Sequence, residues 1–340
     1  MFGSTLGQQQ QQQQKIEVAN PPSDGITSLK FSSKNNYLTA GSWDKQLRVW
    51  EVTNQPQAAM KAMINYEAPI LCTDWSPDCF KIYAGGCDNK AKVWDLQSNT
   101  LTQVAQHNAP IKELFWIEES KVLVTGSWDK TLKYWDLRSP QPVLSVDLPE
   151  RVYALDVLHP LLVVGTADRK VKVYNLSSPG VEFSTIEPPL KFQTRCVSCF
   201  PDRTGFAMGS IEGRVAIQYI TDDKQSEEST PGTEGDNAYS VNSIAFAQPY
   251  GTFATAGSDG TFNFWDKENK NRLKQFPKLN NTISAACFNP EATLYAYALS
   301  YDWSKGVNGY DQNSTNTIQI QVVQEADIKG RGKNPKKAAR

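Results

Sequence analysis

The stretch Gly126-Ser127-Trp128-Asp129-Lys130-Thr131-Leu132-Lys133-Tyr134-Trp135-Asp136 decides the fold of this chain. Its residues from Ser127 to Lys130 favour a tight turn, because Ser and Asp side chains bond their own backbone. After the turn, polar and apolar residues alternate, and a period of two is that of a β-strand. The stretch therefore predicts two strands joined by a polar turn.

The same pattern recurs along the chain at a nearly constant spacing. Each copy closes with an aromatic residue or its replacement, at Trp50, Trp94, Trp135, Tyr174, Gln218 and Trp265. The steps between these positions are 44, 41, 39, 44 and 47 residues. Repeats of roughly 40–45 residues that end in Trp-Asp are typical of the blades of a WD-repeat β-propeller.

We predict an all-β chain with a seven-bladed WD-repeat propeller over residues 15–328. A length of 340 residues alone would suggest two domains, but seven such repeats fill most of the chain as one ring. Residues 15–20 form a lone strand ahead of the first blade, which begins near Asp24. Because a ring of blades must hide its free edges, we expect this strand to pair with the last blade and close the circle.

Three segments fall outside the repeat. Residues 1–14, with seven consecutive glutamines, and the tail 329–340 are predicted to be disordered. Residues 221–240 are acidic and are predicted to form a mobile loop between blades 5 and 6. The tail carries six basic residues in twelve, which suits a nuclear-import signal, a phosphate-binding arm or a solubilising end. Blades 2 to 5 are expected to begin at Lys61, Thr102, Leu144 and Ser184.

Composition narrows the class of protein. A net charge of −1 argues against a globally basic nucleic-acid binder, so any such contact must come from a local patch. No apolar run reaches the roughly 18 residues of a membrane span, and no secretory leader is present, so we expect a soluble intracellular protein without membrane insertion. Cys196 and Cys199 resemble a metal-binding pair, but on a strand they point to opposite faces. We expect no metal and no cofactor.

Blade 3 is the most complete repeat. His107, Thr125, Asp129 and Trp135 match the hydrogen-bonded tetrad that WD-repeat blades use to lock loop, turn and strand. His, Asp and a hydroxyl are also the parts of a catalytic triad, but no Gly-rich oxyanion turn accompanies them. We therefore predict a structural clamp and no catalytic residue. A propeller enzyme would also need convergent ionisable groups in its central channel, and the sequence indicates none.

Two tryptophans, Trp43 and Trp128, occupy the tips of Ser-x-Asp turns where other repeats carry Cys87 or Ala167. An exposed aromatic ring is the usual anchor of a peptide-binding hot spot; the alternative is a tryptophan folded over the loop of the next blade. Cations on the same rim would suit an acidic, amphipathic segment. The predicted partner-peptide site comprises Trp43, Lys45, Trp128, Lys130, Arg151 and Arg195.

A second basic run follows Trp265 on the outer part of blade 6. Such a run can contact RNA phosphates without base specificity, whereas Lys-rich outer strands also serve to block edge pairing. Both interpretations stay open. The residues concerned are Lys267, Lys270, Arg272 and Lys274.

Longer motifs are more specific than the repeat. They lie at residues 106–112, 126–136, 148–153, 209–217 and 300–306. Together they resemble the WD-repeat messenger-RNA export factors that dock on a nuclear-pore protein, a family whose sister is the mitotic-checkpoint WD-repeat protein. The resemblance covers about residues 20–328 and implies a seven-bladed propeller without catalytic activity.

The resemblance also implies a partner. Members bind a short acidic segment of their partner across one rim, and the residues that meet it correspond here to Trp43, Trp128 and Arg195. The basic run of blade 6 matches the family region implicated in nucleic-acid contact. Relatives carry a Phe-Lys-Cys-His-Arg stretch after blade 5, where this chain has the acidic residues 221–240.

We therefore expect a non-enzymatic adaptor in nuclear export of messenger RNA. It would bind an acidic docking segment of a nucleoporin and link messenger ribonucleoprotein, or RNA itself, to the nuclear pore complex at the nuclear envelope, with a further pool in the cytoplasm. The alternative is a mitotic spindle-checkpoint scaffold that binds a checkpoint kinase segment through the same rim. Its partners would be mitotic checkpoint proteins and tubulin or spindle factors.

Overall fold

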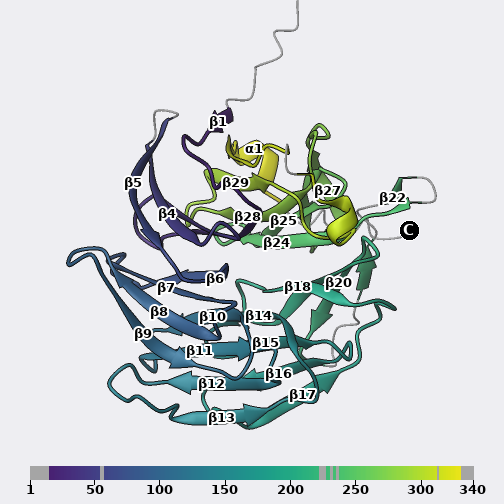
Figure 1. Cartoon of the computed structure of the whole chain (residues 1–340). Helices are drawn as coiled ribbons and strands as arrows, with labels where there is room; N and C mark the ends of the chain where they lie inside the picture. The colour runs from purple at the N-terminus through teal and green to yellow at the C-terminus, as the bar shows by residue number, and fades with distance from the viewer. Residues whose placement is uncertain are drawn as a thin grey trace, which may run out of the picture.

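The computed structural model describes residues 15–53, 57–221, 227–229, 233–234, 237–311 and 314–330. Over these residues the strands form seven four-stranded antiparallel sheets and one two-stranded hairpin. Each four-stranded sheet is a blade, and the inner strands surround a central channel (Figure 1). The predicted all-β, seven-bladed propeller is confirmed. Residues 1–14 and 331–340, predicted to be disordered, lie outside the described residues.

Each blade runs from an inner first strand to an outer fourth strand. Blades 1 and 2 consist of β2 (Ile26–Phe31), β3 (Tyr37–Ser42), β4 (Gln46–Thr53), β5 (Gln57–Asn65), β6 (Ile70–Trp75), β7 (Lys81–Gly86), β8 (Lys90–Asp95) and β9 (Thr100–Gln106). Blades 3 and 4 consist of β10 (Ile111–Ile117), β11 (Val122–Ser127), β12 (Thr131–Trp135), β13 (Leu144–Asp147), β14 (Val152–Leu158), β15 (Leu161–Thr166), β16 (Val171–Asn175) and β17 (Glu182–Ile186).

The remaining blades follow the same order. Blades 5 and 6 consist of β18 (Thr194–Cys199), β19 (Gly205–Ser210), β20 (Val215–Tyr219), β21 (Glu227–Ser229), β24 (Val241–Ala247), β25 (Thr252–Gly257), β26 (Phe262–Asp266) and β27 (Asn271–Gln275). Blade 7 consists of β28 (Ile283–Phe288), β29 (Leu294–Leu299), β30 (Thr317–Val322) and β1 (Lys15–Glu17). The hairpin is β22 (Thr233–Glu234) with β23 (Asn237–Ala238), and the short helical elements are η1 (Val307–Gly309) and α1 (Glu325–Ile328).

The hydrophobic core is divided among the gaps between blades. Seven clusters of buried side chains are present, and each draws on two neighbouring blades. Trp94 of blade 2 packs with Leu47 of blade 1, for example, and Trp135 of blade 3 packs with Tyr83 of blade 2. The repeat aromatics are therefore buried between blades, where each blade covers the apolar face of the next.

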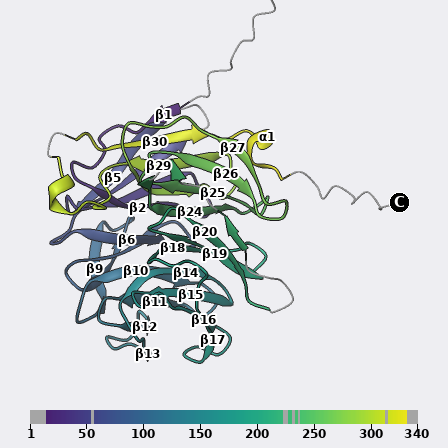
Figure 2. The ribbon, with the colours of Figure 1, turned by 90° about the vertical axis from the view of Figure 1, so that its right-hand side faces the viewer.

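The N-terminal strand closes the ring. β1 pairs antiparallel with β30, with Ile16 opposite Ile320, and Figure 2 shows the two strands side by side. The amide of Val18 continues the ladder by donating to the Ile318 carbonyl at 2.9 Å. Trp50 of blade 1 donates its indole N–H to the Ala19 carbonyl at 2.8 Å. The predicted closure of the last blade by this strand is confirmed.

The predicted blade boundaries are wrong at the outer strands. β5 pairs with β4 along residues 57–65, so residues 61–65 close blade 1 instead of opening blade 2. The predicted starts of blades 3, 4 and 5 at Thr102, Leu144 and Ser184 fall in the same way within β9, β13 and β17. The physical reason is that the third strand of each blade needs a partner on its outer edge, and the next segment of the chain supplies it through a hairpin.

The third strand of blade 5 also needs a partner on its outer edge, and part of the acidic segment 221–240 supplies it. Its residues 227–229 form β21, which pairs with β20 as the outer strand of blade 5, and β22 pairs with β23. The prediction of a loop throughout this segment is therefore wrong. The outer edge of β20 is covered by the acidic segment itself.

Ring closure can be tested through the one buried side chain of β1. Ile16 is only 5% exposed within the cluster shared by blades 7 and 1, so we expect Ile16→Ala to lower the free energy of unfolding by about 2–4 kcal/mol. Urea denaturation followed by tryptophan fluorescence measures this. Lys15→Ala, at an exposed position of the same strand, should change stability by less than about 0.5 kcal/mol. Equal effects of the two substitutions would contradict a closing role for β1.

Candidate partner-binding rim

The turns between second and third strands share one face of the ring with the loops that enter the first strands. The amide of Trp128 donates to the Pro110 carbonyl at 3.0 Å, and the amide of Trp43 donates to the Gly25 carbonyl at 2.9 Å. The same backbone bond recurs in the other five blades, from the amides of Cys87, Ala167, Ile211, Ser258 and Ser300. These bonds fix turn tips and entry loops as one rim.

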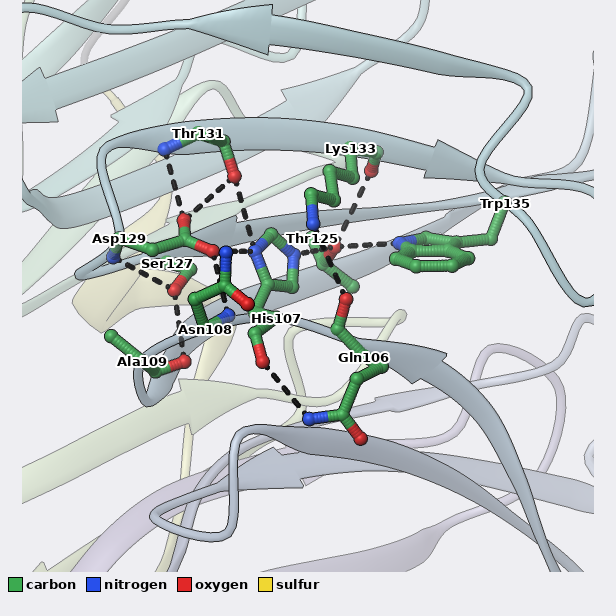
Figure 3. A network of polar contacts seen from close by, with 10 residues as sticks. All are labelled: Gln106, His107, Asn108, Ala109, Thr125, Ser127, Asp129, Thr131, Lys133 and Trp135. Atoms are coloured by element: carbon green, nitrogen blue, oxygen red, sulfur yellow. Dashed lines mark hydrogen bonds and ion pairs between the residues drawn. The ribbon is translucent and has the colours of Figure 1, made fainter.

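A chain of side-chain hydrogen bonds holds the turn of blade 3 and runs through Asp129, His107, Thr125 and Trp135 (Figure 3). His107 Nδ1 lies 2.9 Å from Asp129 Oδ2, and His107 Nε2 lies 2.7 Å from Thr125 Oγ1. The indole N–H of Trp135 donates to Thr125 Oγ1 at 2.9 Å. A neutral imidazole with its proton on Nδ1 satisfies all three contacts, because the Thr125 hydroxyl can then donate to Nε2 while it accepts from Trp135.

Burial sets the protonation of this network. It lowers the pKa of His107, against a smaller opposite effect of Asp129, so the ring is neutral near pH 7. For Asp129, burial alone would raise the pKa, but hydrogen bonds from His107, Thr131 and the Asn108 amide together lower it well below its usual range. His107 is 1% exposed, so its ring is closed to solvent in this structure. The group resembles a triad in composition and holds the Trp128 turn in place.

Blade 1 holds its turn with an ion pair instead of a histidine. Arg48 Nη1 lies 2.7 Å from Asp44 Oδ2, and the two side chains are 8% and 6% exposed. Asp44 Oδ2 also accepts the amide of Ser23 at 3.0 Å. The turn that carries Trp43 is thereby tied to β4 on one side and to the entry loop on the other.

Part of the predicted site converges on the mouth of the channel. The channel has a volume of about 910 Å³, and its lining includes Trp43 and Trp128 from two turns and Arg195 from β18. Trp303, between β29 and β30, lies in the same lining. Trp128 is 36% exposed, and Arg195 is exposed. Two aromatic anchors and a cation from blades 1, 3 and 5 thus face one opening.

The other three predicted cations lie elsewhere on the rim. Lys45, Lys130 and Arg151 are exposed but do not line the channel. The ammonium of Lys130 pairs with the carboxylate of Glu150, whose second oxygen accepts the Arg151 amide at 3.1 Å. The bond from Lys130 is the main reason that the pKa of Glu150 is lowered. A partner carboxylate at Lys130 would have to compete with this internal pair.

The prediction of an exposed ring at Trp43 is wrong, because the structure covers part of this side chain. Its ring lies 5.7 Å from that of Trp303, and the residue is half-buried. The Trp43 ring packs closely against Gly25, where a Cβ would lie only 3.3 Å from the ring. The segment after β29 reaches across the gap between blades 7 and 1, which corresponds to the alternative of a tryptophan folded over a neighbouring loop.

Residues 301–311, which we call the blade 7 insertion, are absent from the site predicted from sequence. Tyr301, Trp303 and Tyr310 form an aromatic cluster, in which Trp303 and Tyr310 stack at 5.5 Å. The Trp303 and Tyr310 side chains are 37% and 38% exposed. Three aromatic residues within ten positions of a polar insertion were the signal that the sequence carried.

Ionisable groups do converge inside the channel, contrary to expectation. Lys30 Nζ lies 3.5 Å from Asp74 Oδ1, and Lys112 Nζ lies 2.5 Å from Glu113 Oε1. Burial raises the pKa of Glu113 against the effect of Lys112. The prediction was wrong because the first strands of neighbouring blades present side chains to the same channel, where Lys30 of blade 1 meets Asp74 of blade 2. Lys112 and Glu113 are neighbours in β10, and both line the channel at the register shift of that strand. In this arrangement the cations and carboxylates pair with each other.

The basic run of blade 6 is largely engaged in structural contacts. Lys267 is buried, with Nζ 3.4 Å from Asp202 Oδ2 and 4.8 Å from the centre of the Phe200 ring, so its predicted RNA contact is wrong. Lys274 pairs with Asp327 of α1 at 2.6 Å, and Figure 2 shows α1 beside β27. Arg272 is exposed and lies over the Trp265 ring at 5.9 Å. Lys270 is also exposed.

Neither a cluster of metal ligands nor a membrane-spanning helix occurs in the described part of the chain. No group of three or more His, Cys, Asp or Glu residues there is arranged to hold a metal ion. Burial raises the pKa of the Cys196 thiol to about 12, and that of Cys199 rises as well. None of the described helices is long and apolar enough to cross a membrane.

Known proteins are similar in sequence to this chain over most of its length. The family model for the WD domain, G-beta repeat, matches residues 13–51, 61–95, 98–136 and 230–266. The chain is 47% identical to Protein RAE1 of Arabidopsis thaliana, over 97% of each chain. It is 46% identical to the Poly(A)+ RNA export protein of Schizosaccharomyces pombe, over 94% of this chain and 93% of that protein. Identity to the mRNA export factor of Xenopus tropicalis is 44%, over 98% and 95% of the two chains.

The neutral state of His107 predicts a pH dependence of stability. Its folded pKa is lowered, so below about pH 6.5 the unfolded chain takes up a proton that the folded chain does not. Stability is therefore fully present above about pH 6.5 and falls below it, by up to about 1.4 kcal/mol per pH unit. Urea denaturation at pH 7.5 and 5.5 measures the loss.

His107→Gln should reduce this dependence and lower stability at pH 7.5 by about 1–3 kcal/mol, because it breaks a buried hydrogen-bonded network. The chain has one other histidine, His159, which is partly exposed. Its Nδ1 lies 3.7 Å from Glu119 Oε1. His159→Gln serves as the matched control and should retain the dependence. An unchanged pH dependence in His107→Gln would show that the ring is not held neutral.

Proposed function

The chain belongs to the family of WD-repeat mRNA export factors, and from this premise we propose that it is a non-enzymatic adaptor in nuclear export of messenger RNA. In this proposal the channel mouth binds an acidic docking segment of a nucleoporin and thereby links messenger ribonucleoprotein to the nuclear pore complex. The protein would then act at the nuclear envelope, with a further pool in the cytoplasm.

The observation that carries the proposal is the placement of Trp43, Trp128 and Arg195 around one opening. Partly exposed tryptophans supply large apolar contact areas at a small cost in conformational entropy, and such residues dominate peptide-binding hot spots. Arg195 presents five N–H donors in a fixed fork, of which the Asp302 carbonyl takes one at 3.0 Å. The remaining donors suit a carboxylate of the incoming segment.

The acidic residues 221–240 bear on the choice of partner. They stand where the family resemblance places a basic stretch after blade 5, so Arg195 would carry more of the electrostatic recognition here. Negative charge in this segment disfavours partner segments that bring their own carboxylates close to it. We therefore expect a docking segment with its carboxylates concentrated opposite Arg195.

The alternative of a mitotic spindle-checkpoint scaffold would use the same rim on a checkpoint kinase segment, with checkpoint proteins, tubulin or spindle factors as partners. The names of the three relatives, RAE1, Poly(A)+ RNA export protein and mRNA export factor, favour the export proposal. For the same reason a propeller enzyme ranks lower, although ionisable groups meet in the channel.

A direct RNA contact would rest on fewer residues than the sequence indicates. Lys267 is buried and Lys274 is only partly exposed, so we place the proposed contact at Lys270 and Arg272, which are exposed on blade 6. Two cations provide weak, sequence-independent phosphate contact. RNA would then reach the pore mainly as ribonucleoprotein held by other components.

A titration with a fluorescent peptide tests the adaptor proposal. The peptide carries the acidic docking segment of a nucleoporin, and anisotropy reports its dissociation constant. We expect Trp128→Ala and Arg195→Glu each to weaken binding more than tenfold, about 1.4 kcal/mol, because one removes an anchor and the other reverses the charge that meets a carboxylate. Phe183→Ala serves as the control, since this phenylalanine is 58% exposed on β17, away from the channel.

Absence of binding by the folded wild type would refute a nucleoporin docking segment as the ligand. Binding that neither rim substitution alters would instead refute the channel mouth as its site.

The salt dependence of RNA binding tests the second contact. Each phosphate contact on single-stranded RNA contributes about 0.7 to the slope of log K against log salt. Replacing Lys270 and Arg272 together by alanine should therefore reduce the slope by about 1.4, as measured by fluorescence anisotropy with a labelled RNA. Lys121→Ala, at an exposed lysine of blade 3, should leave the slope unchanged. An unaltered slope in the double variant would place RNA binding elsewhere.

A further inference from the structure

Asp302 joins the blade 7 insertion to blade 6. Its side chain is buried, with 5% of the residue exposed. Oδ2 accepts hydrogen bonds from Asn242 Nδ2 at 2.8 Å and from the Ser258 hydroxyl at 2.5 Å. Oδ1 accepts the amide of Ser304 at 3.1 Å. Asn242 lies in β24 and Ser258 in the turn after β25, so one carboxylate ties the insertion to both the inner strand and the rim turn of blade 6.

The backbone of the same residue reaches the candidate binding groups. The Asp302 carbonyl accepts a hydrogen bond from Arg195 Nη2 at 3.0 Å, so it holds the guanidinium of blade 5 across the face of blade 6. The next residue, Trp303, packs on Trp43 of blade 1. Asp302 therefore lies between the cation and one aromatic pair of the channel mouth.

The conformation of the insertion has an energetic cost that these contacts offset. Trp303 has a φ of 60°, in the left-handed region that bulky side chains rarely adopt, at a cost on the order of 1–3 kcal/mol. Hydrogen bonds to a buried carboxylate are among the stronger ones in proteins. Burial would raise the pKa of Asp302, yet the bonds from Ser258, Asn242 and Ser304 lower it, so the carboxylate stays charged near pH 7.

We infer that Asp302, held by Asn242 and Ser258, is a positioning residue that sets Arg195 and Trp303 in the arrangement to which the acidic segment binds. The inference rests on the proposed function, since it names what pre-organises the site for that partner. The two polar side chains of blade 6 thereby fix binding groups that come from blades 5, 7 and 1. Pre-organised binding groups lose less conformational entropy when a partner binds.

The test is Ser258→Ala in the full chain, with the nucleoporin peptide as probe. We expect peptide affinity to fall about five- to tenfold, chiefly through faster dissociation. Amide hydrogen exchange in residues 301–311 should become faster, while exchange in blade 3 stays unchanged. Ser210→Ala is the control, because Ser210 is a buried serine at the end of β19 in blade 5, one residue before the turn position that corresponds to Ser258. Ser258→Thr, which keeps the hydroxyl, should restore affinity.

A double-variant comparison separates positioning from general stability. In an Arg195→Gln, Trp303→Ala background, Ser258→Ala should weaken the residual binding by less than twofold, because the groups that it positions are gone. A full five- to tenfold loss in that background, together with a matching loss of thermal stability, would overturn the inference in favour of a merely structural serine. Wild-type binding that Ser258→Ala leaves unchanged would also overturn it.

The proposed function and the positioning role of Asp302 can be refuted separately. If the folded wild type does not bind the peptide, the proposed function is wrong, and with it the inference. If the wild type binds and Arg195→Glu abolishes binding while Ser258→Ala does not weaken it, only the positioning role is wrong. Should Ser258→Ala fail to fold, Asp302→Asn provides the second variant, since it keeps the side-chain shape and replaces one acceptor oxygen by a donor.

Discussion

Burial of apolar surface between neighbouring blades is the interaction on which this structure depends. Each of the seven hydrophobic clusters takes its side chains from two blades, so no blade covers both of its faces by itself. An open row of blades would leave two faces in water. The pairing of β1 with β30 completes blade 7 beside blade 1 and removes both. The stability of each blade therefore depends on closure of the whole ring. The closed ring also fixes the rim turns relative to one another.

The rim combines a constant backbone with variable side chains. The same hydrogen bond joins turn to entry loop in every blade, whereas the turn aspartate is held by Arg48 in blade 1 and by His107 in blade 3. The tip residue can therefore change without displacing the turn. Trp43 and Trp128 reach one channel mouth although they lie in blades 1 and 3, far apart in the chain, because the ring places alternate blades around a common opening.

Several cations near the rim and on blade 6 form ion pairs within the protein. Arg48, Lys130, Lys267 and Lys274 each pair with a carboxylate of the same chain. Arg195 differs, because its guanidinium meets a backbone carbonyl and keeps its charge uncompensated by that contact. A single oriented arginine between aromatic rings favours recognition of one carboxylate at a defined place, whereas a broad basic surface would favour any polyanion. This electrostatic arrangement agrees with a net charge near zero.

The amino-acid sequence by itself determined the blade number, the closing strand and the tryptophans at the turn tips, because these follow from a local repeat of turn and strand chemistry. It also indicated the contacts around His107, whose partners occupy fixed places in one repeat. Only the tertiary structure decided that Lys267 is buried, that Trp303 covers Trp43, and that Asp302 holds Arg195. These contacts join residues of different blades, and no local period encodes which side chains meet when the ring closes.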